Sequence, residues 1–115
     1  MSLVNEGTGI VTLMDVREPG IHIHLDARLA GNGDLCLEGQ DLGPKVRELT
    51  GDDEYEYFLT VRAEHVGAVA AALACQRANL LAALRDAYAN ETFTGTADLK
   101  ALLDQHGIPC ETHVC

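Results

Sequence analysis

A strict alternation of apolar and polar residues over positions 21–28 constrains the fold more than any other feature of the chain. The odd positions carry Ile, Ile, Leu and Ala, whereas the even positions carry His, His, Asp and Arg. Because neighbouring side chains of a strand point to opposite faces, this pattern predicts a strand with one buried and one exposed face. The turn-forming stretch Gly31-Asn32-Gly33-Asp34 follows, since Gly and Asn accept positive φ. Residues 21–28 and 35–38 are therefore predicted to form an antiparallel hairpin.

Apolar spacing and turn residues predict the other elements of the first half. Strands are expected over residues 9–16 and 54–62, the second of them inside the sheet. The stretch Gly39–Pro44 is expected to break the strand before it, because it is rich in turn-forming residues. Asp41 is then a candidate cap for a short helix over residues 43–49.

Helices dominate the second half of the chain. Apolar residues at helical spacing predict a long helix over residues 64–89, and the polar stretch 76–79 offers a point where it could break in two. A last helix over residues 96–106 is expected to be capped by a neighbouring threonine and to end at a Gly-Ile-Pro stop signal. Residues 109–115 are then predicted to form a short edge strand.

The element order β-β-β-(α)-β-α-α-β predicts an α+β fold. Short turns between the early strands require an antiparallel sheet, so we expect a two-layer sandwich of four or five strands with two or three helices on one face. The length of 115 residues suits a single domain over residues 1–115, with residues 1–8 as a loose leader.

Charge and composition narrow the function. The net charge of −10 with only eight Lys and Arg residues disfavours nucleic acid and anionic membranes as partners. The first residues lack a basic region and an apolar run, and no segment reaches the ~18 apolar residues of a membrane span. We therefore expect a cytoplasmic protein, and reduced thiols at Cys36, Cys75, Cys110 and Cys115.

Much of the negative charge lies between Asp34 and Glu56, where eight acids accompany two bases. Concentrated negative charge favours encounter with a basic protein, and tyrosines at its edge would be good interface anchors. One alternative is a solvated acidic face with buried tyrosines. A second alternative is divalent-cation binding, although no calcium-loop pattern is present. The candidate partner-binding residues are Asp34, Glu38, Asp41, Asp52, Asp53, Glu54, Glu56, Tyr55 and Tyr57.

A second candidate site is a metal site on the polar face of the 21–28 strand. Alternation places His22, His24 and Asp26 on one face, where imidazole and carboxylate could hold a divalent ion. His113 and Cys115 share parity on the C-terminal segment and would join them if that segment paired with the 21–28 strand. The competing interpretation is an ordinary solvent-facing polar strand.

The sequence contains none of the common catalytic motifs. The glycine-rich turns lack the lysine of a phosphate-binding loop, and Ser2 is the only serine, which removes a serine hydrolase. No cofactor is therefore predicted beyond a possible divalent metal. We expect a non-enzymatic binding module for a basic protein partner, and keep as alternatives a metal-binding protein or metal-dependent enzyme and a homodimeric structural subunit.

Three stretches carry a resemblance to other proteins: Asp34–Gly43, Gly51–Tyr57 and His106–Pro109. In these stretches the chain resembles a group of small, acidic, uncharacterised bacterial proteins, mainly actinobacterial, over about residues 21–115. In size and acidity it is also similar to immunity proteins that neutralise basic toxins, which implies a basic protein as partner. The tail of the group tends to be aromatic, whereas residues 110–115 here read Cys-Glu-Thr-His-Val-Cys.

Overall fold

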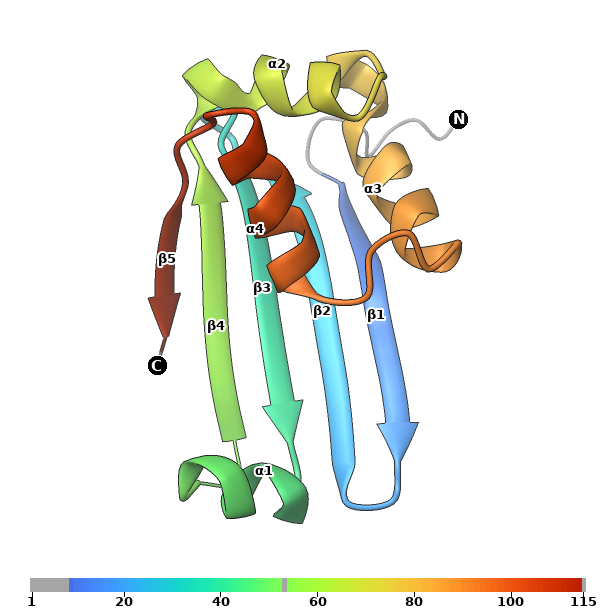
Figure 1. The fold of residues 1–115 in the computed structure, drawn as a ribbon, viewed down its shortest axis with the longest axis vertical. Coiled ribbons are helices and arrows are strands. Elements are labelled where there is room, and N and C mark those ends of the chain that lie inside the picture. Colours follow the sequence, from blue (N-terminus) through green and yellow to red (C-terminus); the bar gives the residue numbers. More distant parts are fainter. Residues whose placement is uncertain (1–8, 53, 115) are drawn as a thin grey trace.

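The computed structural model describes residues 9–52 and 54–114 and shows an antiparallel five-stranded sheet whose strands follow one another in chain order (Figure 1). Helices collect on one side of this sheet, so the predicted α+β two-layer sandwich is confirmed. The elements are β1 (Ile10–Glu18), β2 (Ile21–Leu29), β3 (Leu35–Leu42), α1 (Pro44–Thr50), β4 (Glu54–Val61), α2 (Ala63–Ala72), a 3-10 turn (Arg77–Asn79), α3 (Leu80–Ala89), α4 (Thr96–Gln105) and β5 (Glu111–Val114).

The predicted hairpin forms the centre of the sheet. β2 pairs with β3 in the register Ala27 opposite Leu37, and Gly33 in the turn adopts a φ of 95°. Leu25 and Ala27 are fully buried, whereas the alternate polar residues His22, His24, Asp26 and Arg28 stay partly exposed. The alternation over residues 21–28 therefore separates a helix-covered face from an open face, as the sequence predicts.

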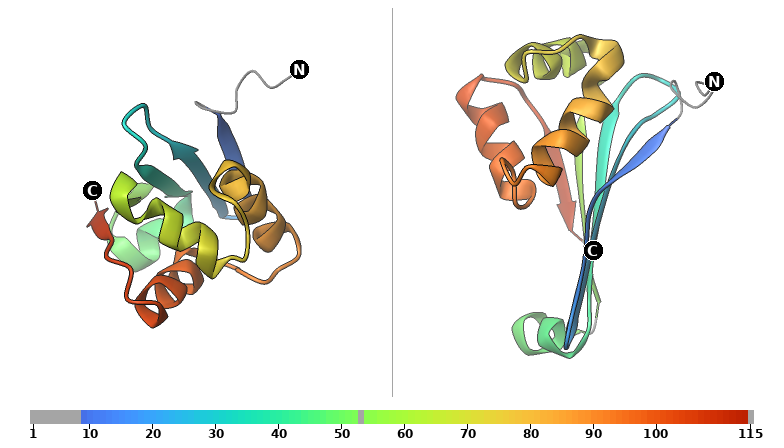
Figure 2. Two further views of the ribbon diagram at one scale, coloured as in Figure 1. Left: turned by 90° about the horizontal axis from the view of Figure 1, so that it is seen from above. Right: turned by 90° about the vertical axis from the view of Figure 1, so that its right-hand side faces the viewer.

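The core lies between the sheet and the helices α2, α3 and α4. These helices cover the upper part of the sheet as drawn, and α1 lies at the opposite end of the strands (Figures 1 and 2). The lower part of the same sheet face is left without a helix over it. The largest fully buried side chains are Leu25, Leu35, Leu37, Leu80, Leu84, Leu99, Leu103, Val61, Val66 and Val69.

The predicted break at Gly39–Pro44 is wrong for its first half, because β3 continues to Leu42. Gly39 is buried beneath the ring of Tyr57 from β4, and a Cβ atom at Gly39 would lie 2.0 Å from a ring carbon of that tyrosine. Gly39 thus keeps its place in the strand because a neighbouring aromatic ring covers it. The short helix α1 has Gly43 as its N-cap, so Asp41 does not cap it.

The long apolar helix is broken, as the polar stretch 76–79 indicates. α2 ends at Ala72 and α3 begins at Leu80, with an 82° bend between the two helical segments. In the described part of the chain, no single helix is long and apolar enough to cross a membrane, and only this bent pair reaches the required length and apolarity together.

The end of α4 confirms the predicted stop signal. Gly107 adopts a φ of 66°, and Ile108, which is 5% exposed, donates its backbone N–H to the Leu103 carbonyl at 2.9 Å. At the start of the helix, Gly95 rather than a threonine is the N-cap. The chain then returns along the sheet as β5, which pairs with β4.

Candidate functional site

One face of the sheet carries no helix from residues 9–52 and 54–114. In the side view of Figure 2, the helices α2, α3 and α4 lie to one side of the strands, and no helix of the described part of the chain lies on the other side. The strand register places alternate residues on that open face. One row across the sheet, for example, reads Thr12, Asp26, Glu38, Phe58 and His113. We call this surface the open face.

Acidic side chains outnumber basic ones on the open face. Among the described residues, its acids come from all five strands, and two arginines lie on β1 and β2. Arg62, just after β4, also reaches the face, with its Nε 3.0 Å from Glu111 Oε2. Phe58 and Leu42 supply half-buried apolar side chains among them. The charged residues of the face are Asp15, Asp26, Glu38, Glu54, Glu56, Glu111, Arg17 and Arg28.

Some of these acids form ion pairs or hydrogen bonds with polar neighbours. Arg28 Nε lies 3.6 Å from Glu38 Oε1, and Gln40 donates its amide N–H to Glu54 Oε2 at 2.6 Å. The side chain of Glu56 makes no hydrogen bond or ion pair with any other described residue. Its carboxylate is therefore available to a partner.

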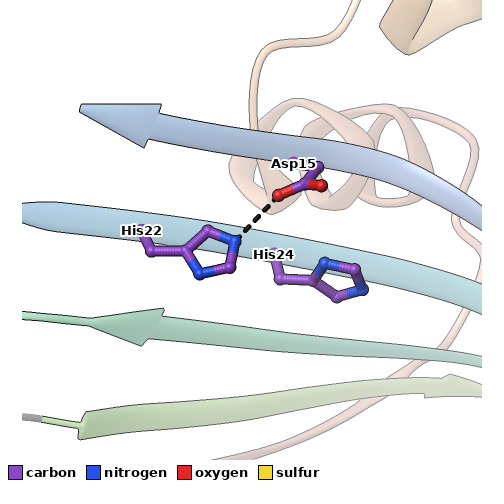
Figure 3. A group of neighbouring side chains, drawn as sticks. All are labelled: Asp15, His22 and His24. Carbon is purple, nitrogen blue, oxygen red and sulfur yellow. Dashed lines mark hydrogen bonds and ion pairs between the residues drawn. The ribbon is translucent and has the colours of Figure 1, made fainter.

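Two histidines and an aspartate meet on the open face near the free edge of the sheet (Figure 3). His22 Nε2 lies 2.8 Å from Asp15 Oδ1, and the rings of His22 and His24 are 6.3 Å apart between centroids. One ligand atom from each of the three residues can be chosen so that all lie within 4.8 Å of one another. The hydrogen bond from His22 lowers the pKa of the Asp15 carboxyl.

A β-bulge brings Asp15 into this group. Thr12 lies opposite Asp26, but the next paired residue of β1 is Met14, opposite Leu25, so Leu13 is an extra residue. Both Leu13 and Met14 therefore fall on the helix side, and Asp15 is moved onto the open face opposite His24. Without the bulge, the period of two would place Asp15 opposite Ile23 on the covered face.

A further aspartate holds His24. Asp26 Oδ1 lies 2.9 Å from His24 Nε2, and the same oxygen accepts a hydrogen bond from the Thr12 hydroxyl at 3.1 Å. When His24 is neutral and donates from Nε2, its Nδ1 keeps a free lone pair. Asp26 therefore orients the imidazole.

The predicted metal residues are only partly brought together. His22, His24 and Asp26 share the open face, as the alternation predicts. β5 pairs with β4 and not with β2, so His113 stands three strand spacings, roughly 14 Å, from the histidine pair. Cys115 lies outside the described residues. Asp15 is not among the residues predicted from the sequence, because the bulge that exposes it is set by strand pairing.

The predicted acidic surface is divided by the alternation of the strands. Glu38, Glu54 and Glu56 lie on the open face, whereas Asp41, Tyr55 and Tyr57 lie on the helix side. Asp52 stands in the turn before β4, and Asp53 lies outside the described residues.

Asp34, the first acid of that predicted surface, has a structural role at the start of α2. It is 8% exposed, and its Oδ1 accepts the backbone N–H of Ala63, the first residue of α2, at 2.8 Å. Arg62 Nη1 lies 3.5 Å from its other oxygen. Asp34 thus satisfies a free N–H at the start of α2 from a distant part of the chain.

The helix side of the sheet contains a hollow of about 560 Å³ where the covering helices end. Asp41, Tyr55 and Tyr57 line it from the sheet, and the first turn of α4 with Lys100 lines it from above. Tyr57 donates its hydroxyl to Asp41 Oδ1 at 3.4 Å. Burial raises the pKa of the Asp41 carboxyl, and burial together with the Asp41 charge raises the pKa of Tyr57 to about 12.

No protein-family model, curated protein or solved structure matches this chain. The open face, the histidine group and the hollow are the features of the molecule that bear on its function.

Proposed function

We propose that the protein is a non-enzymatic binding module that docks a basic protein through the open face, in the manner of an immunity protein or inhibitor. The observation that carries this proposal is the bare sheet face with its excess of acids around Phe58. Four strands of about eight residues and the four-residue β5, at ~4.8 Å spacing and ~3.3 Å rise, span roughly 440 Å² before side-chain relief. That area is a little over half of the ~800 Å² that each partner contributes to a standard interface.

Charge complementarity selects a basic partner over a second copy of the chain. A second open face would bring acids against acids, which opposes association. The outer edge of β1 is also a poor pairing surface, because it carries a bulge and charged side chains at Asp15, Arg17 and Glu18. These features disfavour a homodimer formed through the open face or the β1 edge, which light scattering at high protein concentration would reveal as a doubled mass.

We place this module in the cytoplasm. Cys36, Cys75 and Cys110 are free thiols in the structure. Free thiols are usual in a reducing compartment.

A pull-down with two matched triple variants tests the docking proposal. The open-face variant carries Glu38→Gln, Glu54→Gln and Glu56→Gln. The control variant removes three exposed acids from helices through Glu48→Gln, Glu64→Gln and Asp86→Asn.

At low ionic strength, the wild type and the control variant are expected to retain a basic protein that the open-face variant loses. About 0.3 M salt should release this partner, because screening weakens exposed charge pairs. Retention of the same proteins by all three forms, or of proteins without excess positive charge, contradicts the proposal.

The hollow supports a second candidate function, the binding of a small organic cation with an apolar body. Its volume falls in the range of roughly 300–1,000 Å³ typical of small-molecule sites. The Asp41 carboxylate offers a counter-charge, and the rings of Tyr55 and Tyr57, 5.7 Å apart, offer aromatic faces to a cation. The ammonium of Lys100 already contacts both Asp104 oxygens, at 2.9 and 3.0 Å.

A pair of probes of opposite charge tests this second function. Naphthylmethylamine should shift the NMR signals of residues around the hollow, whereas naphthylacetate, which has the same apolar body, should not. Asp41→Asn should abolish the amine response, and Glu54→Gln on the opposite face should leave it unchanged. Equal binding of both probes would show that Asp41 confers no charge selectivity.

A further inference from the structure

We propose that Asp15, His22 and His24 form a binding site for a divalent transition-metal ion on the open face. This inference is independent of the docking proposal, because it depends on the geometry of three side chains and not on the charge of the whole surface. The ligand atoms of the three residues lie within 4.8 Å of one another. They come from two adjacent strands whose register is fixed by backbone pairing.

Small side-chain movements would bring these atoms to metal-binding distances. Metal–ligand bonds of about 2.0–2.1 Å in a tetrahedral site separate the ligand atoms by about 3.4 Å. Asp15 Oδ1 and His22 Nε2 are 2.8 Å apart, and no pair of the ligand atoms is more than 4.8 Å apart. Rotations about side-chain bonds suffice, so the backbone of β1 and β2 can keep its pairing.

Asp26 acts as a positioning residue for this site. Its carboxylate lies 2.9 Å from His24 Nε2 and is itself held by the Thr12 hydroxyl. Metal-binding histidines commonly bond a carboxylate through the second ring nitrogen, which fixes the tautomer and the ring orientation. Here that arrangement presents His24 Nδ1 to the ion.

The donor set selects the class of ion. Two imidazoles and one carboxylate suit Zn²⁺, Fe²⁺, Co²⁺ or Ni²⁺ better than Mg²⁺ or Ca²⁺, which prefer oxygen ligands. Three protein ligands leave at least one coordination position for water or for a group from a partner. His22 and His24 are partly exposed, so an ion can reach them from solvent.

Titration of untagged, chelator-treated protein with Zn²⁺ and Co²⁺ tests the site. Calorimetry should give one Zn²⁺ per chain, and Co²⁺ should develop visible absorption. His22→Ala, His24→Ala and Asp15→Asn should each weaken Zn²⁺ binding at least about tenfold. The matched control is His113→Ala, which removes an exposed histidine of the same face on β5 and should leave the affinity unchanged.

Asp26→Asn separates positioning from ligation. It should weaken Zn²⁺ binding about 10- to 100-fold while leaving the Co²⁺ absorption spectrum of the saturated protein unchanged. Asp15→Asn should change that spectrum, because it removes a ligand. Circular dichroism shows whether each variant is folded. His22→Gln replaces His22→Ala if the alanine variant does not fold. Absence of stoichiometric Zn²⁺ binding, or unchanged affinity in folded His22 and His24 variants, would overturn the proposal.

Discussion

Asp15 lies directly opposite His24 across the β1–β2 pair because β1 carries one extra residue at Leu13. This one-residue bulge turns a carboxylate out of the covered face and places it beside two imidazoles. The same bulge keeps both Leu13 and Met14 on the helix side, so burial of apolar side chains and exposure of the acid have one cause.

The contact between Gly39 and Tyr57 predicts a steric coupling. Gly39→Ala should lower the free energy of unfolding by about 1–3 kcal/mol, because its Cβ would lie 2.0 Å from the Tyr57 ring. In a Tyr57→Ala background the same change should be neutral or stabilising, since Ala suits a strand better than Gly. Urea unfolding of the double-mutant cycle measures this difference. Equal effects of Gly39→Ala in both backgrounds would show that the ring does not fill the space above Gly39.

Asp34 is predicted to support α2. Removal of its buried carboxylate leaves the Ala63 N–H without its acceptor, so Asp34→Ala should cost about 1–3 kcal/mol of unfolding free energy. Asp34→Asn keeps an oxygen at the same place and should cost less. Neither variant should change the affinity for a basic partner beyond its effect on folding. If Asp34→Ala is stable but binds the partner more weakly, Asp34 belongs to the partner-binding surface and this prediction is wrong.

Asp98 predicts a pH-dependent contribution to stability. The Thr94 backbone N–H and hydroxyl donate to its Oδ2 at 2.7 and 3.0 Å and lower the pKa of Asp98. A carboxyl with a lowered folded-state pKa stabilises the fold above its unfolded pKa of about 3.9, and this stabilisation is lost as the pH falls through the folded value. Asp98→Ala should therefore reduce the melting temperature at pH 7, and the reduction should shrink as the pH falls below about 4.

The matched control for that experiment is Asp86→Ala on the exposed side of α3. Its effect should be small at every pH at which the protein is folded. If the Asp98→Ala reduction in melting temperature stays constant from neutral to acidic pH, the ionised carboxylate does not cap the Thr94 turn.

Local patterns in the sequence predict most of the fold. The alternation at residues 21–28 and the following turn fix the central hairpin, because strand period and positive φ are short-range properties. The break before α3 and the stop at Gly107 are local for the same reason. The extension of β3 through Gly39 is not local, since it depends on a tyrosine from another strand.

The candidate sites depend more strongly on tertiary structure. Parity alone places His22, His24 and Asp26 together, but Asp15 joins them only through a bulge whose position is set by pairing with β2. The acids of residues 34–56 lie close together in the sequence. In the sheet, however, the alternation of side chains places Glu38 and Asp41 on opposite faces. The hollow exists because the helices end before the strands do, which depends on how they pack.

We propose above that the open face is the surface that binds a basic protein. The most direct test measures the affinity of the basic protein recovered in the pull-down for the wild type and for the two triple variants, at low and moderate salt. We predict that the Glu38, Glu54 and Glu56 variant binds at least about tenfold more weakly at low salt and depends less on salt, since each removed charge pair contributes up to ~1 kcal/mol. The helix-acid control should match the wild type. Equal weakening of both variants would contradict the claim, because it would show that net charge and not the open face determines binding.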